Sequence, residues 1–350
     1  MSYSKTQINK AGKIFKDMLG QDFNDIVWAE EALTYWRTIH SSVIADFHNE
    51  IKAKVDEVNA NSLIVQRLKR SQSIIFKLNR IDGMKLSRMQ DIAGVRVILD
   101  NISEVYSLAE KLQVPDFKHE FKNAKDYIHE PKESGYRGIH LIYKFSSPEN
   151  PETDGLFIEV QLRTKLQHTW ATAVETMSTF LGTHLKFDQG QPKWLKYFAL
   201  TSSAFSFFEK TPSVPQYNKL TELETLQMAL YEYNYYKIDE SLSAYSMAVD
   251  IICTKIDSSK KYHIVTLDTE NISVTIESYD PERIVEANQR YTEIEKNSVN
   301  EQSVLVSTET IQALQDGFPN YFLDIEAFLV QMQKIKERLN ELKVIANNNA

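Results

Sequence analysis

One short segment, residues 157–163, alternates polar and apolar side chains. Such alternation is typical of a β-strand, in which successive side chains point to opposite faces. One face would carry a carboxylate, an amide and a guanidinium, from Glu159, Gln161 and Arg163. A polar face is common on an edge strand, but the amphipathic helix expected directly afterwards, at residues 165–181, favours a central position. On a central strand these groups suit a metal–nucleotide complex, with the carboxylate for Mg²⁺ and the guanidinium for phosphate.

A second carboxylate, Asp91, stands just before residues 93–99, an apolar run that predicts another strand. An aspartate in this position is often only a turn or helix-cap residue. If the two strands are neighbours, however, Asp91 and Glu159 can meet at one magnesium ion, whose remaining ligands would be phosphate and water. Phosphoryl-type transfer depends mainly on positioning and charge neutralisation, so such a pair would be sufficient for that chemistry.

A basic segment precedes Asp91. Residues 62–80 continue the apolar spacing of a helix that is expected from residue 22, and Arg67, Lys69 and Lys77 would lie on its opposite face. A basic stripe on a helix is usually a solvated face. It becomes a candidate phosphate clamp here because it lies upstream of a site that would hold a triphosphate.

A basic loop is expected between the two strands. Residues 127–140 contain Pro131 and Gly135, which shape a loop, together with Lys132 and Tyr136. The flat ring of Tyr136 can stack on a base, a contact worth about 1–3 kcal/mol. The segment is therefore a plausible nucleotide cradle, and the alternative is an ordinary basic entry to a hairpin.

Further elements must position these residues. Strands are expected at residues 93–99, 138–145 and 156–162, with helices at 103–112 and 165–181 and an irregular segment at 114–136. Two prolines mark a linker at 209–218. Beyond it we expect a long helix or helix pair at 219–254, strands at 262–267, 272–278 and 303–306, and helices at 281–295, 308–316 and 321–342. The sequence thus predicts two α+β domains, residues 1–215 and 216–350.

Bulk composition excludes several classes of protein. The chain has 350 residues, enough for two buried cores, and it contains neither a long apolar run nor a signal peptide, so we expect cytoplasmic localisation without membrane contact. Its single cysteine, Cys253, lies in an apolar run that indicates a buried structural thiol. The net charge of −8 comes from residues 216–350, since residues 1–215 are nearly balanced. An acidic second part can simply aid solubility, or it can compete with phosphates for the basic site.

Taken together, the motifs resemble the RelA/SpoT synthetase domain across roughly residues 30–185. Five segments occur in the order and spacing of that family: Arg67-x-Lys69-x3-Ser73-x3-Lys77; Asp91-Ile92-Ala93-Gly94-Val95-Arg96; Tyr127-Ile128-x2-Pro131-Lys132-x-Ser134-Gly135-Tyr136-x3-His140; Glu159-Val160-Gln161-Leu162-Arg163-Thr164; and Gln167-His168-Thr169-Trp170-Ala171-x3-Glu175. Upstream, Trp36-Arg37-x2-His40 resembles the small and toxin-type members, and no hydrolase-type His-Asp segment is present. The resemblance implies a mixed β-sheet flanked by helices, related to nucleotidyltransferases, with a second, C-terminal α+β domain.

The resemblance also implies roles for individual residues. The enzyme would move pyrophosphate from ATP to a ribose 3′-hydroxyl, with Mg²⁺ as cofactor. Asp91 and Glu159 would be the catalytic and metal-binding residues. The ATP-binding residues would be Arg67, Lys69, Ser73 and Lys77, and the acceptor-binding residues Lys132, Tyr136, His140, Gln161 and Arg163.

Residues 216–350 resemble the C-terminal part of fused toxin–antitoxin members, the CapRel-like phage sensors. In those proteins the acceptor is the 3′ CCA end of tRNA, translation stops, and the C-terminal domain inhibits the enzyme until a phage protein binds. A Tyr-x-x-Tyr element plugs their ATP site. Its counterpart here would be Phe318 and Tyr321, which departs at the first position, with Tyr233 and Tyr236 as a rival pair, and either pair could instead be core aromatics. The alternative acceptor is GDP or GTP, which would make the chain a (p)ppGpp synthetase. The sequence does not give the oligomeric state.

Overall fold

The computed structural model describes residues 2–17, 21–114, 117–180, 191–238, 250–252, 260, 262–268, 270–271, 273–297, 301–307, 316–319 and 325–348. The helices are α1 (Lys5–Lys16), α2 (Phe23–Asn59), α3 (Ser71–Arg80), α4 (Ile102–Leu112), α5 (Lys165–Phe180), α6 (Pro192–Glu209), α7 (Glu222–Tyr235), α9 (Ile284–Asn297) and α11 (Glu326–Asn348). The strands are β1 (Leu63–Leu68), β2 (Ala93–Leu99), β3 (Glu120–Asp126), β4 (Ile139–Lys144), β5 (Phe157–Thr164), β6 (Asp250–Ile252), β7 (Tyr262–Asp268), β8 (Ser273–Tyr279) and β9 (Glu301–Ser307). Among the described helices, none has an apolar stretch long enough to cross a bilayer.

The first five strands form a mixed sheet in the order β1-β2-β5-β4-β3. Strands β2 and β5 pair in parallel, and every other neighbouring pair is antiparallel. Strand β5 is therefore central, and Gly94 of β2 lies opposite Glu159 of β5. Both the central position of β5 and its adjacency to the strand that follows Asp91 are confirmed.

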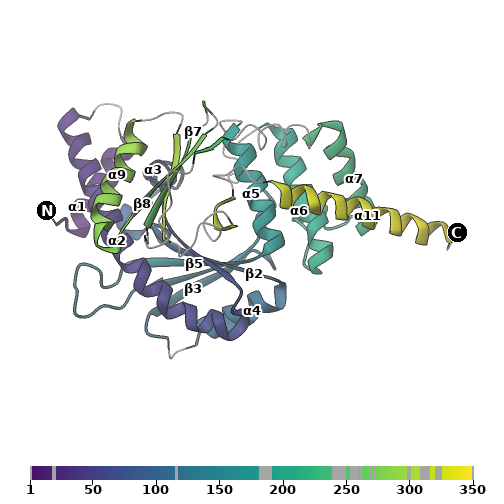
Figure 1. Ribbon diagram of the computed structural model, residues 1–350, viewed down its shortest axis with the longest axis horizontal. Helices are drawn as coiled ribbons and strands as arrows, with labels where there is room; N and C mark the ends of the chain where they lie inside the picture. Colours follow the sequence, from purple (N-terminus) through teal and green to yellow (C-terminus); the bar gives the residue numbers. More distant parts are fainter. Residues whose placement is uncertain are drawn as a thin grey trace.

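One face of this sheet is apolar and packs against α2 and α4 (Figure 1). Alternate positions of β2 and β5 point to that side, where the core is closed by α2 residues that recur every fourth position, namely Phe47, Ile51 and Val55, all fully buried. The spacing places these side chains on one stripe of the helix, so burial of the stripe explains why α2 forms here. The opposite face of the sheet is left for polar side chains.

A second sheet, in the order β6-β8-β7-β9, lies above the polar face of the first sheet at its β1 end. Its strand β7 is buried on both faces. Val265 and Leu267 contact Val65 of β1 within one cluster, whereas Ile264 joins the cluster that includes Tyr291 of α9. The second sheet therefore connects directly to both α9 and the first sheet.

A third core is entirely helical. Helices α5, α6, α7 and α11 pack together around residues such as Trp170, Phe198 and Phe328, and Figure 1 shows α11 running out from this bundle to the C-terminus, at the opposite end of the molecule from α1. All three cores join residues from both sides of position 215 or lie across both sheets. The domain boundary between residues 215 and 216 stays a prediction.

The prediction of one helix over residues 62–80 is wrong. Residues Leu63–Leu68 form strand β1, antiparallel to β2, and α3 begins only at Ser71. The prediction rested on apolar residues four positions apart, a spacing that also places side chains on one face of a strand. Arg67 therefore comes from a strand, with Lys69 just after it, whereas Ser73 and Lys77 come from a helix.

Three other elements differ from expectation. Strand β3 lies in a segment expected to be irregular, and β6 lies inside the expected long helix over 219–254, of which α7 is the only helical part described. Helix α6 was not expected at all. Cys253 and most of the expected helix at 308–316 lie outside the described residues. The other expected helices and strands are present, with ends shifted by a few residues.

Candidate active site

Asp91 lies at the entrance to β2 and pairs with two lysines. Lys69 Nζ lies 3.0 Å from one oxygen of its carboxylate, and Lys77 Nζ lies 2.8 Å from the other. Lys69 follows β1 and Lys77 projects from α3, so the change from strand to helix at residues 69–71 brings both ammonium groups to one carboxylate. Burial alone would raise the pKa of Asp91, but the two lysines outweigh burial and hold the pKa well below its usual value.

Glu159 occupies the centre of the polar face. It accepts hydrogen bonds from His140 Nδ1 at 2.8 Å and from Gln161 Nε2 at 2.6 Å. Burial would raise the pKa of Glu159, but His140 and its hydrogen bond lower it to about 2. The charge of Asp91 acts in the opposite direction and raises the pKa of Glu159. The two carboxylates are therefore close enough to interact, as the sequence predicted.

Tyr136 and Lys132 extend this arrangement. The Tyr136 hydroxyl lies 2.7 Å from His140 Nε2, so a neutral His140 that donates from Nδ1 to Glu159 can accept a hydrogen bond from Tyr136. Lys132 Nζ lies 4.2 Å from the centre of the Tyr127 ring and 4.9 Å from that of Tyr136. Burial raises the pKa of Tyr136 to about 12, which keeps this hydroxyl protonated at neutral pH. These residues form one chain of contacts that ends at Glu159.

Gly135 allows this loop to pack against α6. Its φ is +93°, and a Cβ built there would lie 2.8 Å from Ser202 Cβ and 2.9 Å from the Trp170 ring. Ser202 holds the same place, since its hydroxyl donates to the Gly135 carbonyl at 2.6 Å and accepts from Arg137 Nε at 2.9 Å. A glycine is thus required on grounds of both conformation and space.

Three arginines line the other side of the polar face. The burial of Arg96 and of Arg163 lowers the pKa of each, and the charge of Arg67 lowers both further. Nε of Arg96, Nε of Arg163 and Nδ1 of His168 are buried and form no hydrogen bond with the described residues. Repelling cations with unused donors suit an anionic or hydrogen-bonding ligand.

The C-terminal part covers this arginine face. Arg96 Nη1 donates to the Gly317 carbonyl at 3.0 Å, and the Arg96 guanidinium lies 5.6 Å from the centre of the Phe318 ring. His168 Nε2 lies 2.9 Å from the Asp316 carbonyl oxygen. Phe318 is 3% exposed and also belongs to the apolar cluster around Val65. Tyr321 lies outside the described residues, and the rival pair, Tyr233 and Tyr236, packs against the helical core.

The arrangement brings together most residues selected from the sequence. Lys69, Lys77 and Asp91 form one cluster, and Lys132, Tyr136, His140, Glu159 and Gln161 form the adjoining one. Ser73 lies half-buried in the first turn of α3. Arg67 and Arg163 lie on the arginine face.

Two sets of residues were missed by sequence reasoning. Arg96 carried a usable signal, since it is the only charged side chain in an otherwise apolar strand, yet it was assigned no role. Arg37 and Glu295, a buried ion pair beside α3, carried none, because the partners are far apart in the sequence.

Comparison with known proteins agrees with the position of this site. Residues 66–180 match the family described as a region found in RelA/SpoT proteins. The GTP pyrophosphokinase YwaC of Bacillus subtilis is 30% identical over 159 residues, which cover 41% of this chain and 71% of that protein. The GTP pyrophosphokinase YjbM of the same organism is 30% identical over 126 residues, 35% of this chain and 59% of that protein. The crystal structure of small alarmone synthetase 1 from Bacillus subtilis bound to its product pppGpp aligns with a TM-score of 0.42 and 23% identity, covering 49% of this chain and 89% of that one.

Proposed function

The chain belongs to the RelA/SpoT family and is a pyrophosphokinase of that type, and from this premise we propose that it transfers pyrophosphate from ATP to the 3′-hydroxyl of a ribose. The ribose oxygen would form a bond to the β-phosphorus of ATP while the bond from that phosphorus to the α-phosphate oxygen breaks. AMP would leave, and the proton of the hydroxyl would pass to a base. The observation that carries the proposal is the adjacency of two ionised carboxylates, Asp91 and Glu159, beside Lys69 and Lys77.

Lys69 and Lys77 would bind the phosphates of ATP, with Arg67 and Ser73 beside them. Both lysines now neutralise one carboxylate, and Lys69 is only 8% exposed. Burial lowers the pKa of Lys69, whereas Asp91 opposes that effect. A triphosphate would supply the same kind of negative charge, so the site is prepared for an anion.

Mg²⁺ fits the chemistry of the carboxylates. In the part of the chain that the structure describes, no group of three or more acidic, histidine or cysteine side chains forms a metal site, so a bound ion would rely on Asp91 and Glu159 with phosphate and water as further ligands. The mutual repulsion of the two carboxylates supports this assignment, because a shared cation would relieve it. When bound, the ion would neutralise charge that develops on the transferring group.

Glu159 and His140 would take the proton of the attacking hydroxyl. With a pKa of about 2, Glu159 is ionised at neutral pH and free to accept a hydrogen bond from that hydroxyl, but it is a weak base. His140 contacts the same carboxylate and is the natural second station for the proton. Lys132, Tyr136, Gln161 and Arg163 would orient the acceptor around this pair.

Two acceptors are proposed. GDP or GTP is supported by the printed activity of YwaC and YjbM, both GTP pyrophosphokinases. The 3′ CCA end of tRNA is supported by a different observation, the covering of the arginine face by residues 316–318. An enzyme that inactivates tRNA would stop translation and would need such restraint.

On this second reading the C-terminal part inhibits the enzyme. Phe318 over Arg96 would exclude a nucleotide from the arginine face, and a phage protein that binds the C-terminal part would withdraw it. Activity would then appear only during infection, as an anti-phage defence. Cytoplasmic localisation is part of the same proposal.

The test uses the full-length chain with Mg²⁺ and ATP labelled at the γ-phosphate, offered GDP, GTP or deacylated tRNA. Label on a guanosine nucleotide, with one AMP formed per label transferred, is expected for an alarmone synthetase, and label on tRNA alone is expected for a tRNA-modifying toxin. Label released only as inorganic phosphate, with ADP in place of AMP, would refute pyrophosphate transfer altogether. The Glu159→Gln variant provides the background value.

A further inference from the structure

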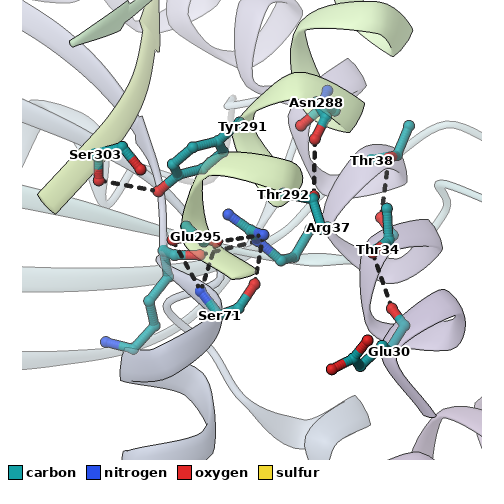
Figure 2. Close-up of polar contacts among 11 residues, drawn as sticks. Glu30, Thr34, Arg37, Thr38, Ser71, Asn288, Tyr291, Thr292, Glu295 and Ser303 are labelled. Atoms are coloured by element: carbon teal, nitrogen blue, oxygen red, sulfur yellow. Dashed lines mark hydrogen bonds and ion pairs between the residues drawn. The ribbon is translucent and has the colours of Figure 1, made fainter. Parts of the chain in front are cut away.

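An ion pair is buried where α2, α3 and α9 meet. Arg37 Nη1 of α2 lies 2.9 Å from the carboxylate of Glu295 of α9, and the two side chains are only 2% and 6% exposed. Figure 2 shows the guanidinium, this carboxylate and Ser71 pointing toward one another. Burying two charges is costly unless further hydrogen bonds satisfy them, so the remaining contacts of the pair indicate its purpose.

Arg37 holds the junction between β1 and α3. Its Nε donates to the Lys69 carbonyl at 3.2 Å, and its Nη1 also donates to the Ser71 hydroxyl at 2.5 Å. The flat guanidinium lies 4.6 Å from the centre of the Tyr291 ring. One rigid group therefore fixes both the residue that carries the Lys69 ammonium and the first residue of the helix that carries Lys77.

Glu295 caps the same helix. The residue at the cap position of α3, Arg70, provides no side-chain hydrogen bond. Both carboxylate oxygens of Glu295 instead accept from the Ser71 backbone N–H, at 3.3 Å each. A helix start has unpaired N–H groups and a partial positive charge, and a carboxylate there stabilises both. Here the carboxylate comes from the C-terminal part of the chain.

We infer that Arg37 and Glu295 are positioning residues for the ATP-phosphate site, which set Lys69 and Lys77 at the distance that a triphosphate requires. The inference rests on the proposed function. It makes the C-terminal part a contributor to the catalytic unit, in addition to any inhibition by residues 316–318. Sequence comparison alone does not point to this, since the RelA/SpoT match ends at residue 180.

The opposite role for Glu295, an anion that competes with the triphosphate, is disfavoured by the packing. Tyr291, one turn before Glu295, is fully buried in the main core, and Ile294 belongs to the same cluster. Arg37 is 2% exposed with α9 in place, so a phosphate cannot reach it while this core is intact. A carboxylate held so firmly acts as a fixed support.

The experiment compares Glu295→Gln with the unaltered full-length chain, under Mg²⁺ and saturating acceptor. We expect KM for ATP to rise roughly fivefold or more, as for loss of a charged helix cap, while KM for the acceptor stays unchanged. Binding of a non-hydrolysable ATP analogue, measured by calorimetry, should weaken by the same factor. A matched control is Glu293→Gln, on the same helix but 62% exposed, which should leave every constant unchanged.

A second variant keeps the test sharp if Glu295→Gln folds poorly. Ser71→Ala removes one contact of Arg37 without touching the ion pair, and it should raise KM for ATP in the same direction. A lower KM for ATP in Glu295→Gln, or equal changes in both substrates, would overturn the inference. If the unaltered chain transfers label and Glu295→Gln matches it, only the inference fails. If the unaltered chain neither transfers label nor binds the analogue, the proposed function fails and the inference falls with it.

Discussion

Replacing Glu159 with glutamine tests the centre of the proposed site. The substitution preserves the size of the side chain and one acceptor oxygen, but it removes a charge that receives hydrogen bonds from His140 and Gln161. Because Glu159 would both bind metal and accept a proton, we expect the rate of pyrophosphate transfer to fall about 10²–10⁴-fold, the range found for general acid–base groups. KM for ATP should change much less, since Lys69 and Lys77 remain in place.

The structure also gives the expected change in stability. The pKa of Glu159 is lowered from the ordinary value of 4.5 to about 2, which corresponds to an upper limit of roughly 3 kcal/mol of native-state stability at neutral pH. For a carboxylate with a lowered pKa, this contribution is complete above about pH 4.5 and disappears as pH falls toward 2. The unfolding free energies of Glu159→Gln and the unaltered chain should therefore differ at pH 7 and converge in acid.

Two measurements on the same preparations decide the matter. Transfer from γ-labelled ATP gives the catalytic effect, and urea unfolding at pH 7 and pH 3 gives the stability difference at each pH. Glu152→Gln serves as the control, since this exposed residue between β4 and β5 only accepts a hydrogen bond from the Tyr35 hydroxyl. Full activity in Glu159→Gln would refute the assignment of the active site. A stability difference that grows in acid would refute the assigned ionisation of Glu159.

Three further substitutions probe the surroundings of this pair. Asp91→Asn leaves its two lysines without a counter-charge, so we expect a loss of about 3–5 kcal/mol in urea unfolding at pH 7 and inactivity in label transfer; a fully stable variant would contradict the pairing. Gly135→Ala places a methyl group 2.8 Å from Ser202 Cβ at a φ of +93°, so Tm should fall and KM for the acceptor should rise, and an unchanged KM would argue against a role for this loop. Phe318→Ala removes the ring over Arg96 and should raise transfer activity despite a stability loss of about 3–5 kcal/mol, whereas unchanged specific activity of the folded variant would count against inhibition by this residue.

The sequence was informative where one strand contains its own signal. The alternation in β5 depends only on neighbouring residues, so it predicted the polar face of Glu159, Gln161 and Arg163, and with the run after Asp91 it predicted two adjacent strands. Strand β1 was misjudged because its pairing with β2, about 30 residues later, decides its conformation. Apolar residues at even spacing fit a helix and a strand equally well, and tertiary pairing made the choice.

Strand β3 shows a different limit. It lies at the edge of the first sheet, pairs only with β4, and most of its side chains are exposed. No apolar face had to be buried there, so the sequence contains no alternation to detect. Helix α6 was missed for the opposite reason, since most of its residues between Trp194 and Ser206 are buried and the stripe that marks a surface helix is absent.

The contacts of the C-terminal part were beyond prediction, and together they assign it two opposing effects. Glu295 supports the lysines that would bind ATP, whereas Phe318 covers an arginine face that a nucleotide would use. Deletion from residue 216 would remove both at once, along with apolar residues that complete all three cores, so an inactive truncated chain would not argue against inhibition. Point substitutions separate the effects by sign, since Glu295→Gln should weaken ATP binding and Phe318→Ala should increase transfer. Combined in one chain, the two changes should act independently, because their contacts lie on different elements, α3 and β2.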